Sequence, residues 1–143
     1  MQGKYRLMKI NMETDYALRI MRCIANNGGI VSAASIADSV SVSQRFTLKI
    51  LGKLVSGGVL FSHKGKSGGY ELARPADEIT LRSVIEVIEG PIVISRCLSQ
   101  DFVCSHDGTN DSCNCYFNRV FDEINMIIAA KLDSVTIKDS LSQ

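Results

Sequence analysis

The stretch from residue 32 to residue 73, SAASIADSVSVSQRFTLKILGKLVSGGVLFSHKGKSGGYELA, decides the fold. Apolar residues at steps of three and four predict two short helices, over 32–40 and 44–55, separated by a turn at 41–43. Ser43 is expected to cap the second helix, whose remaining faces carry polar and basic residues. Two short helices joined by a tight turn are typical of a helix-turn-helix.

The residues that follow the second helix predict a small β wing. Residues 59–62 and 69–73 are expected to form two antiparallel strands, and the Gly-rich basic loop HKGKSGG lies between them. A phosphate-binding P-loop is excluded, because that motif requires a glycine five positions before Gly65, where the chain has Leu60. A wing directly after a helix-turn-helix predicts a winged helix-turn-helix domain.

Polar and basic residues of the second helix and the wing are the candidate DNA contacts. N-terminal residues of such a helix reach base edges in the major groove, so Gln44, Arg45 and Thr47 are the expected base readers. Basic residues beside them are expected to meet backbone phosphates. The candidate DNA-binding residues are Ser43, Gln44, Arg45, Thr47, Lys49, Lys64, Lys66 and Ser67. The alternative is that the basic residues form an ordinary solvated helix face.

The charge distribution agrees with a polyanionic partner for the first half of the chain. Residues 1–75 hold eleven Lys and Arg against four Asp and Glu, a net charge of +7. Residues 76–143 hold five against eleven, a net charge of −6, so the whole chain carries +1. A basic half beside an acidic half suggests that only the first half meets a polyanion, although uneven surface charge without a partner gives the same counts.

Four further helices are expected outside the stretch from residue 32 to residue 73. The first covers 14–26, with Thr14 or Asp15 as its N-cap, and a second covers 80–89. Cys23, inside the first helix, fits a small core residue. A long helix is expected over 116–132, and the end of the chain at 136–141 is expected to form one more short helix.

The long helix predicts a homodimer. Its apolar residues recur at steps of three and four along one face, and the chain offers no second long helix to cover that face. A second copy that packs its own equivalent helix there gives a two-fold dimer. The alternative is that the helix packs on the chain's own N-terminal helices.

Four of the five cysteines lie in residues 96–115, RCLSQDFVCSHDGTNDSCNC, with the spacing C-x6-C-x8-C-x-C. Thiolates suit iron and zinc equally well. The spacing does not follow the C-x2-C pairs of zinc ribbons, whereas iron–sulfur clusters accept irregular spacing. Without a signal peptide or a membrane-spanning run, a reducing intracellular location is expected, where disulfides are rare. From these residues alone an iron–sulfur cluster, zinc and bare redox thiols all remain open.

Five segments in order carry a resemblance to a known family: TDYALR (14–19), KILGKLVSGGVL (49–60), HKGKSGGYELARP (63–75), IEGPIVISRCL (88–98) and LDSVTIKDSL (132–141). Together they resemble the Rrf2 family of bacterial winged-helix repressors, which includes the IscR and NsrR branches. The resemblance covers the chain from Met8 onward.

The resemblance implies a mainly α fold, with a two-stranded β wing and a long C-terminal dimerisation helix. The division expected is a DNA-binding domain at 8–90, a cluster-binding loop at 91–115, and a dimerisation helix with its tail at 116–143. It also implies a cytoplasmic homodimer that binds double-stranded DNA at a palindromic operator. No enzymatic activity and no membrane contact are expected.

The resemblance further implies a 2Fe–2S or 4Fe–4S cluster. Cys97, Cys104 and Cys115 fall on the three family cysteines, and Asp15 matches the aspartate that completes the cluster from the other subunit in the NsrR branch. Asn118 stands where the IscR branch carries a histidine ligand. The gap between the last two family cysteines is longer than usual and contains Cys113, which is the alternative fourth ligand.

The predicted function is therefore a DNA-binding transcriptional regulator, a repressor, whose operator affinity is controlled by an iron–sulfur cluster in the cysteine loop. One alternative keeps the fold but senses through zinc or bare redox thiols. Another, of a different class, is a metal-handling or enzymatic module without DNA binding. Against it stands the lack of a base–nucleophile pair that the sequence supports.

Overall fold

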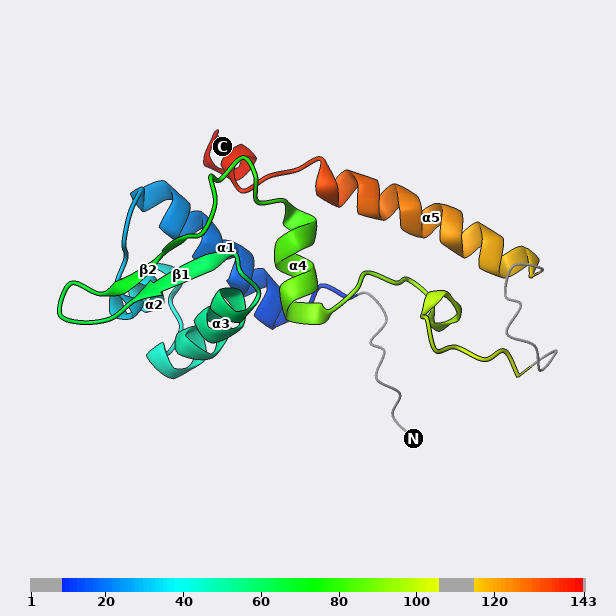
Figure 1. Cartoon of the computed structure of the whole chain (residues 1–143), viewed down its shortest axis with the longest axis horizontal. Helices are drawn as coiled ribbons and strands as arrows, with labels where there is room; N and C mark the ends of the chain where they lie inside the picture. Colours follow the sequence, from blue (N-terminus) through cyan, green and yellow to red (C-terminus); the bar gives the residue numbers. More distant parts are fainter. Residues whose placement is uncertain (1–8, 106–114, 143) are drawn as a thin grey trace.

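The computed structural model describes residues 9–105 and 115–142. Its elements, in chain order, are α1 (Met12–Asn27), α2 (Ala33–Val40), α3 (Gln44–Ser56), β1 (Leu60–His63), β2 (Gly69–Leu72), α4 (Leu81–Glu89), the 3-10 turn η1 (Arg96–Leu98), α5 (Tyr116–Asp133) and the 3-10 turn η3 (Lys138–Ser142). Helices α1 to α4 and the two strands form a body, and α5 extends away from it as an arm (Figure 1). The mainly α fold with a two-stranded wing is confirmed. Within the described residues, no helix is long and apolar enough to cross a membrane.

Three of the four helices of the body begin where the sequence predicts. Ser32, Ser43 and Thr80 cap α2, α3 and α4, and each side-chain oxygen accepts a hydrogen bond from a backbone N–H three residues on. The start of α1 differs from the prediction. Asn11 is its N-cap and accepts from the N–H of Thr14, so neither Thr14 nor Asp15 is the cap.

The core lies between α1, α2, α3 and the strands. Its largest fully buried side chains on the three helices include Ile20, Ile24, Ile36, Ile50 and Leu54. These residues recur at helical spacing, so each helix buries one apolar face. Packing them against one another fixes the angle of α3 relative to α1 and α2, which sets the surface that α3 presents to solvent.

The wing is a two-stranded antiparallel sheet in which Leu60 pairs with Leu72 and His63 pairs with Gly69. Gly69 lies against the segment before α2, where an added Cβ would stand 2.3 Å from the backbone oxygen of Val31. Backbone hydrogen bonds in both directions between Val31 and Tyr70 hold that contact at 2.9 Å. The wing is therefore fixed to the helix-turn-helix at its base.

The C-terminal tail returns to the body. The N–H of Ile137 donates to the backbone oxygen of Ile79 at 2.9 Å, and both side chains are fully buried in the core. A backbone hydrogen bond of 2.8 Å from Leu81 to Val135 continues this contact. The short terminal helix expected at 136–141 is a 3-10 turn at Lys138–Ser142. The end of the segment 116–143 thus belongs to the body, while α5 itself does not.

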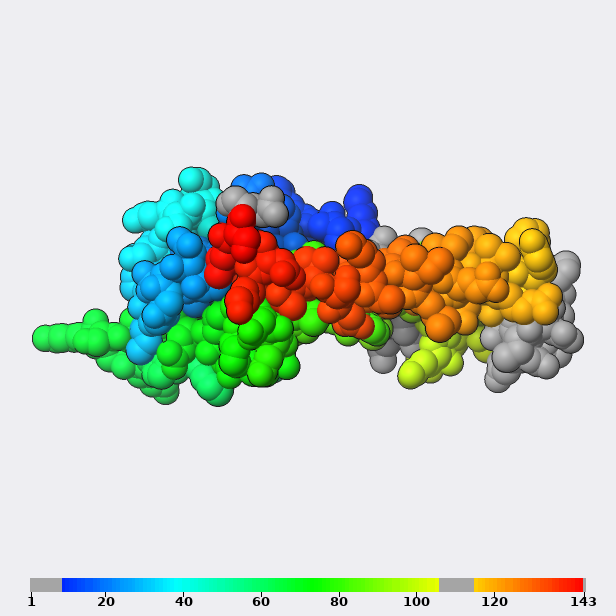
Figure 2. All heavy atoms as spheres, turned by 90° about the horizontal axis from the view of Figure 1, so that it is seen from above, coloured from blue at the N-terminus to red at the C-terminus, as the bar shows by residue number. Residues whose placement is uncertain are grey.

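Helix α5 packs against α4 and η1, and none of its residues is buried. Figure 2 shows it projecting from the body along the long axis of the molecule. Its large exposed apolar side chains are Tyr116, Phe117, Phe121, Ile124, Met126 and Ile127. Such a set on one helix is a typical interaction surface.

Candidate functional site

The exposed face of α3 is the first candidate site. Its solvent-facing residues in the first three turns are Gln44, Arg45, Leu48, Lys49 and Gly52. Ser43 lies just before them and holds the helix N-terminus, because its hydroxyl oxygen accepts from the N–H of Phe46 at 3.2 Å. The face is open, polar and cationic, as a DNA-reading helix requires.

One expected base reader does not lie on this face. The Thr47 side chain is 0% exposed, and its hydroxyl donates to the backbone oxygen of Ser43 at 3.0 Å. Position 47 shares the buried face of α3 with Ile50, Leu51 and Leu54, at the steps three, four and seven. The assignment of Thr47 as a base reader is therefore wrong, because its side chain is part of the core side of the helix.

A carboxylate of α1 that the sequence analysis did not identify contacts α3. Glu13 Oε1 lies 2.6 Å from Nζ of Lys53 and 3.7 Å from Nζ of Lys49. The Glu13 side chain is only 18% exposed, whereas that of Lys49 is 60% exposed and still faces solvent. Helix α3 is thus joined to α1 by a partly buried ion pair.

The loop of the wing carries the other predicted DNA contacts. Lys64, Lys66 and Ser67 are all exposed between β1 and β2. The loop extends beyond the body, at the far end from α5 (Figure 1). A polar contact of 2.7 Å between His63 Nε2 and Glu71 Oε1 joins the two strands just below the loop. The wing therefore presents two ammonium groups at a projecting tip.

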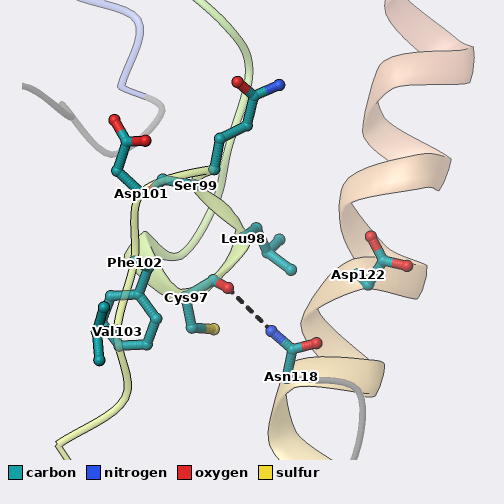
Figure 3. Close-up of a pocket in the computed structure, with 9 residues that line it drawn as sticks. Cys97, Leu98, Ser99, Asp101, Phe102, Val103, Asn118 and Asp122 are labelled. Carbon is teal, nitrogen blue, oxygen red and sulfur yellow. Dashed lines mark hydrogen bonds between the residues drawn. The ribbon is translucent and has the colours of Figure 1, made fainter. Parts of the chain in front are cut away.

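Cys97 lies in η1, at an open cleft of about 670 Å³ between the cysteine segment and the start of α5. Its sulfur is 3.1 Å from the hydroxyl oxygen of Ser95, and its backbone oxygen accepts from Nδ2 of Asn118 at 3.0 Å. Figure 3 shows Asn118 reaching from α5 to Cys97, with Asp101 and Asp122 also at the cleft. Asn118 thus positions the cysteine backbone against α5.

Among the described residues of one chain, the other predicted cluster ligands do not form a metal-binding group with Cys97. Cys104 is partly exposed, and Cys115 is exposed as the residue before α5. Asp15 lies on the first turn of α1 with a side chain 49% exposed, and its carboxylate is 3.0 Å from Nε of Arg19. Cys113 is outside the described residues. Within 9–105 and 115–142 of one chain, no three His, Cys, Asp or Glu side chains form a group that could hold a metal ion.

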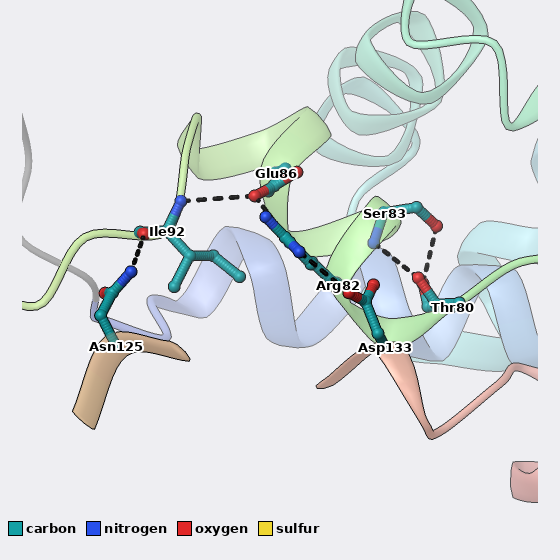
Figure 4. Close-up of polar contacts among 7 residues, drawn as sticks. All are labelled: Thr80, Arg82, Ser83, Glu86, Ile92, Asn125 and Asp133. Atoms are coloured by element: carbon teal, nitrogen blue, oxygen red, sulfur yellow. Dashed lines mark hydrogen bonds and ion pairs between the residues drawn. The ribbon is translucent and has the colours of Figure 1, made fainter. Parts of the chain in front are cut away.

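The segment that leads into η1 is anchored to α5 by one amide side chain. Asn125 Nδ2 donates to the backbone oxygen of Ile92 at 3.1 Å (Figure 4). Its Oδ1 accepts from the N–H of Ile94 at 3.0 Å. A single side chain thereby satisfies one donor and one acceptor of an irregular backbone segment. This contact was not identified from the sequence, because an asparagine at a helical position does not indicate its partner.

A second polar contact joins α4 to α5. The guanidinium of Arg82 contacts Asp133 at 2.9 Å and Glu86 at 3.0 Å (Figure 4). These two carboxylates, Asp133 first, raise the pKa of Arg82 above its ordinary value. Glu86 also accepts from the N–H of Ile92 at 3.5 Å. The cysteine segment, α4 and α5 therefore form one connected polar network.

Comparison with known proteins agrees with this architecture. A profile of the Rrf2 family, described as an iron-dependent transcriptional regulator, matches residues 10–143. An rrf2-like helix-turn-helix transcriptional regulator of Rhodobacter capsulatus is 28% identical over 138 residues, which cover 93% of this chain and 92% of that protein. Protein aau3 of Rhizobium meliloti is 37% identical over 91 residues, 63% of this chain but 59% of that relative, so the match spans less than two thirds of its length.

Two solved structures are similar to the chain over nearly its whole length. CymR, the global cysteine regulator of B. subtilis, has a TM-score of 0.69 and 29% identity, with 95% of this chain and 98% of CymR covered. IscR of T. potens has a TM-score of 0.69 and 27% identity, with 94% of this chain and 87% of IscR covered.

Proposed function

The chain belongs to the Rrf2 family of helix-turn-helix transcriptional regulators, and we propose that it is a homodimeric repressor controlled by an iron–sulfur cluster. As a transcriptional regulator it is not an enzyme. A DNA-binding regulator of a bacterial family acts in the cytoplasm, where its operator is. The proposal has three parts: how DNA is held, how two copies associate, and what the cysteines bind.

The exposed face of α3 is the observation that carries the DNA part. Gln44, Arg45 and Lys49 face solvent while the opposite side of α3 is buried in the core. A helix with such a face enters the major groove and reads base edges from its N-terminal turns. The lysines of the wing loop, Lys64 and Lys66, then meet phosphates of the flanking backbone.

The exposed apolar face of α5 supports the homodimer. Phe117 and Ile127 are 68% and 69% exposed, so most of each residue's surface is uncovered within one chain, and Ile124 between them is 41% exposed. A second copy that lays its own α5 on this face removes both sets from water. Because such a dimer is two-fold symmetric, its operator is a palindrome.

The dimer is tested with Ile127→Glu, which places a charge in the centre of the apolar face. Sedimentation is expected to show a dimer for the wild type and a monomer for the variant, with unchanged helical content by circular dichroism. A dimer that persists in the variant, at the concentrations where the wild type dimerises, would contradict this use of α5.

The cysteines are the proposed ligands of the iron–sulfur cluster. Cys97, Cys104 and Cys115 are unpaired and at least partly accessible, and thiolates are the ligands that iron–sulfur clusters require. The Ser95 hydroxyl oxygen lies 3.1 Å from the Cys97 sulfur, within hydrogen-bonding distance of this ligand. The fourth ligand is Asp15 of the second copy, with Cys113 of the same chain as the alternative. When bound, the cluster supplies a centre that oxidants or nitric oxide can modify.

Contacts on the first turn of α1 couple the cysteine segment to α3. Glu89 at the end of α4 accepts from the Thr14 hydroxyl at 2.5 Å, and the neighbouring Glu13 contacts Lys53 of α3. The first turn of α1 also carries Asp15. A change in the ligation of Asp15 therefore acts on the turn that positions α3, and DNA binding acts back on the cluster by the same coupling energy.

The iron content of the purified protein tests whether the cysteines bind an iron–sulfur cluster. We expect anaerobically purified wild-type protein to be brown and to lose iron and sulfide in Cys97→Ala, Cys104→Ala and Cys115→Ala. Cys23→Ala is the matched control, because Cys23 is a free, half-buried cysteine on α1 outside the segment. Comparing Asp15→Ala with Cys113→Ala identifies the fourth ligand. Colourless protein with stoichiometric zinc would contradict the cluster but leave DNA binding untouched.

A further inference from the structure

Two residues on the exposed face of α3 break the pattern of a polar recognition helix. Leu48 is an apolar residue with 44% of its surface exposed, and it lies among Gln44, Arg45 and Lys49. One turn further on, Gly52 lies inside the helix on the same face. Departures from local rules in an otherwise consistent element mark functional positions.

Leu48 lies outside the face of α3 that packs in the core. The neighbouring Thr47 occupies the core side of α3, so a polar residue is buried and an apolar one is exposed at adjacent positions. Because removing apolar surface from water is favourable, covering Leu48 with another surface lowers the free energy.

Gly52 has no structural reason to be glycine within the described chain. An added Cβ would meet no atom within 4 Å, and the residue has a helical backbone with no positive φ. Alanine forms helices better than glycine, so the fold by itself favours alanine here. Because Gly52 has no side chain, another molecule can approach the backbone of α3 closely beside Leu48.

We propose that Leu48 and Gly52 form an apolar contact strip that determines operator specificity, with Leu48 packed on the 5-methyl group of a thymine. The inference rests on the proposed DNA binding. An apolar side chain can distinguish thymine in the major groove because only thymine carries a methyl group there. Arg45 and Lys49 on either side of Leu48 match the charge of DNA phosphates, so DNA covers the strip in preference to an apolar protein surface. Gly52 lets the duplex come close enough for that contact.

The first test is a selection of randomised DNA duplexes with the wild-type protein, followed by replacement of each thymine of the selected operator by uracil. Uracil lacks only the methyl group. We expect at least one replacement to weaken binding by about fourfold, the effect of one buried methyl group. That replacement should have no effect on Leu48→Ala and should keep its effect on Leu48→Met.

Two results would overturn the inference. One is that no thymine replacement weakens the wild type, and the other is that the replacements weaken the wild type and Leu48→Ala equally. Both results leave the DNA-binding proposal standing, since the wild type has still selected an operator. If the wild type selects no sequence at all, the DNA-binding proposal and the inference fail together.

Gly52→Ala gives an independent test with opposite effects on folding and binding. We expect the melting temperature to rise, because alanine favours the helix, and operator affinity to fall, because the new methyl group blocks the approach. Gly29→Ala is the control, since Gly29 is equally open but lies outside α3. Unchanged operator affinity in Gly52→Ala would overturn the role of the strip.

Discussion

Glu13 Oε1 lies 2.6 Å from Nζ of Lys53, which joins the first turn of α1 to the recognition helix. On the same turn, the buried Thr14 hydroxyl donates to Glu89 of α4. Glu13 thus contacts α3, and the next residue, Thr14, contacts α4. Helix α4 leads into the cysteine segment. The orientation of α3 therefore depends on this turn.

Glu13→Gln tests the contact with α3. We expect the free energy of unfolding to fall by about 1 kcal/mol, because the pair is only partly screened from water. DNA affinity is expected not to fall, since the change frees Lys49 and Lys53 from a competing carboxylate. Urea unfolding and DNA titration measure the two effects. Glu71→Gln, at the more exposed pair with His63, is the control and should change stability less.

The two buried threonines should respond differently to the same substitution. Thr14→Val removes the hydroxyl that donates to the Glu89 carboxylate, and we expect a loss of about 1.5 kcal/mol in unfolding free energy. Thr47→Val removes a bond to the Ser43 oxygen, which still accepts from the Thr47 N–H, so stability should change by less than about 0.5 kcal/mol. Thr47→Val should also bind DNA normally. A loss of base discrimination in that variant would contradict the buried position of Thr47.

The sequence was sufficient for the parts of the fold that depend on local signals. Ser43 caps α3 as expected, because a side-chain oxygen before an apolar repeat is a local signal. The start of α1 was misplaced because Thr14 also fits a cap, whereas its hydroxyl bonds to Glu89, 75 residues away. Nothing in the local pattern indicates that partner.

The candidate site was predictable in its residue types but not in its contacts. The exposed positions of Gln44, Arg45 and Lys49 follow from helical periodicity, and a stricter use of the steps from Thr47 to Ile50 and Leu54 would have placed Thr47 in the core. The contact of Glu13 with α3 depends on the tertiary packing of α1, which a single sequence does not reveal.

Acid should destabilise the C-terminal tail through Asp139. The backbone N–H of Thr136, and then its hydroxyl, donate to the Asp139 carboxylate and lower its pKa below the ordinary value. Since the charged form is favoured in the folded protein, its contribution is present above the unfolded pKa, about 4, and is lost as pH falls through the lower folded pKa. Asp139→Asn should therefore lower the melting temperature at neutral pH and have less effect in acid. An equal shift at both pH values would contradict this role.

The wing lysines should govern the salt dependence of DNA binding. Each of Lys64→Ala and Lys66→Ala is expected to reduce the slope of log affinity against log salt by about 1, because one phosphate contact and its released counterion are lost. Lys138→Ala is the control, since Lys138 is an exposed lysine on the tail, paired with Asp77. A slope that changes no more in the wing variants than in Lys138→Ala would show that the wing does not meet phosphates.

The most direct measurement is the operator affinity of one anaerobic preparation before and after its iron is removed, with Cys97→Ala treated in parallel. Removal of iron should change wild-type affinity by at least about tenfold, within the usual range of coupling between two sites. Cys97→Ala should bind with the iron-free affinity throughout. Equal affinities of the iron-loaded and iron-free wild type would contradict control by a cluster.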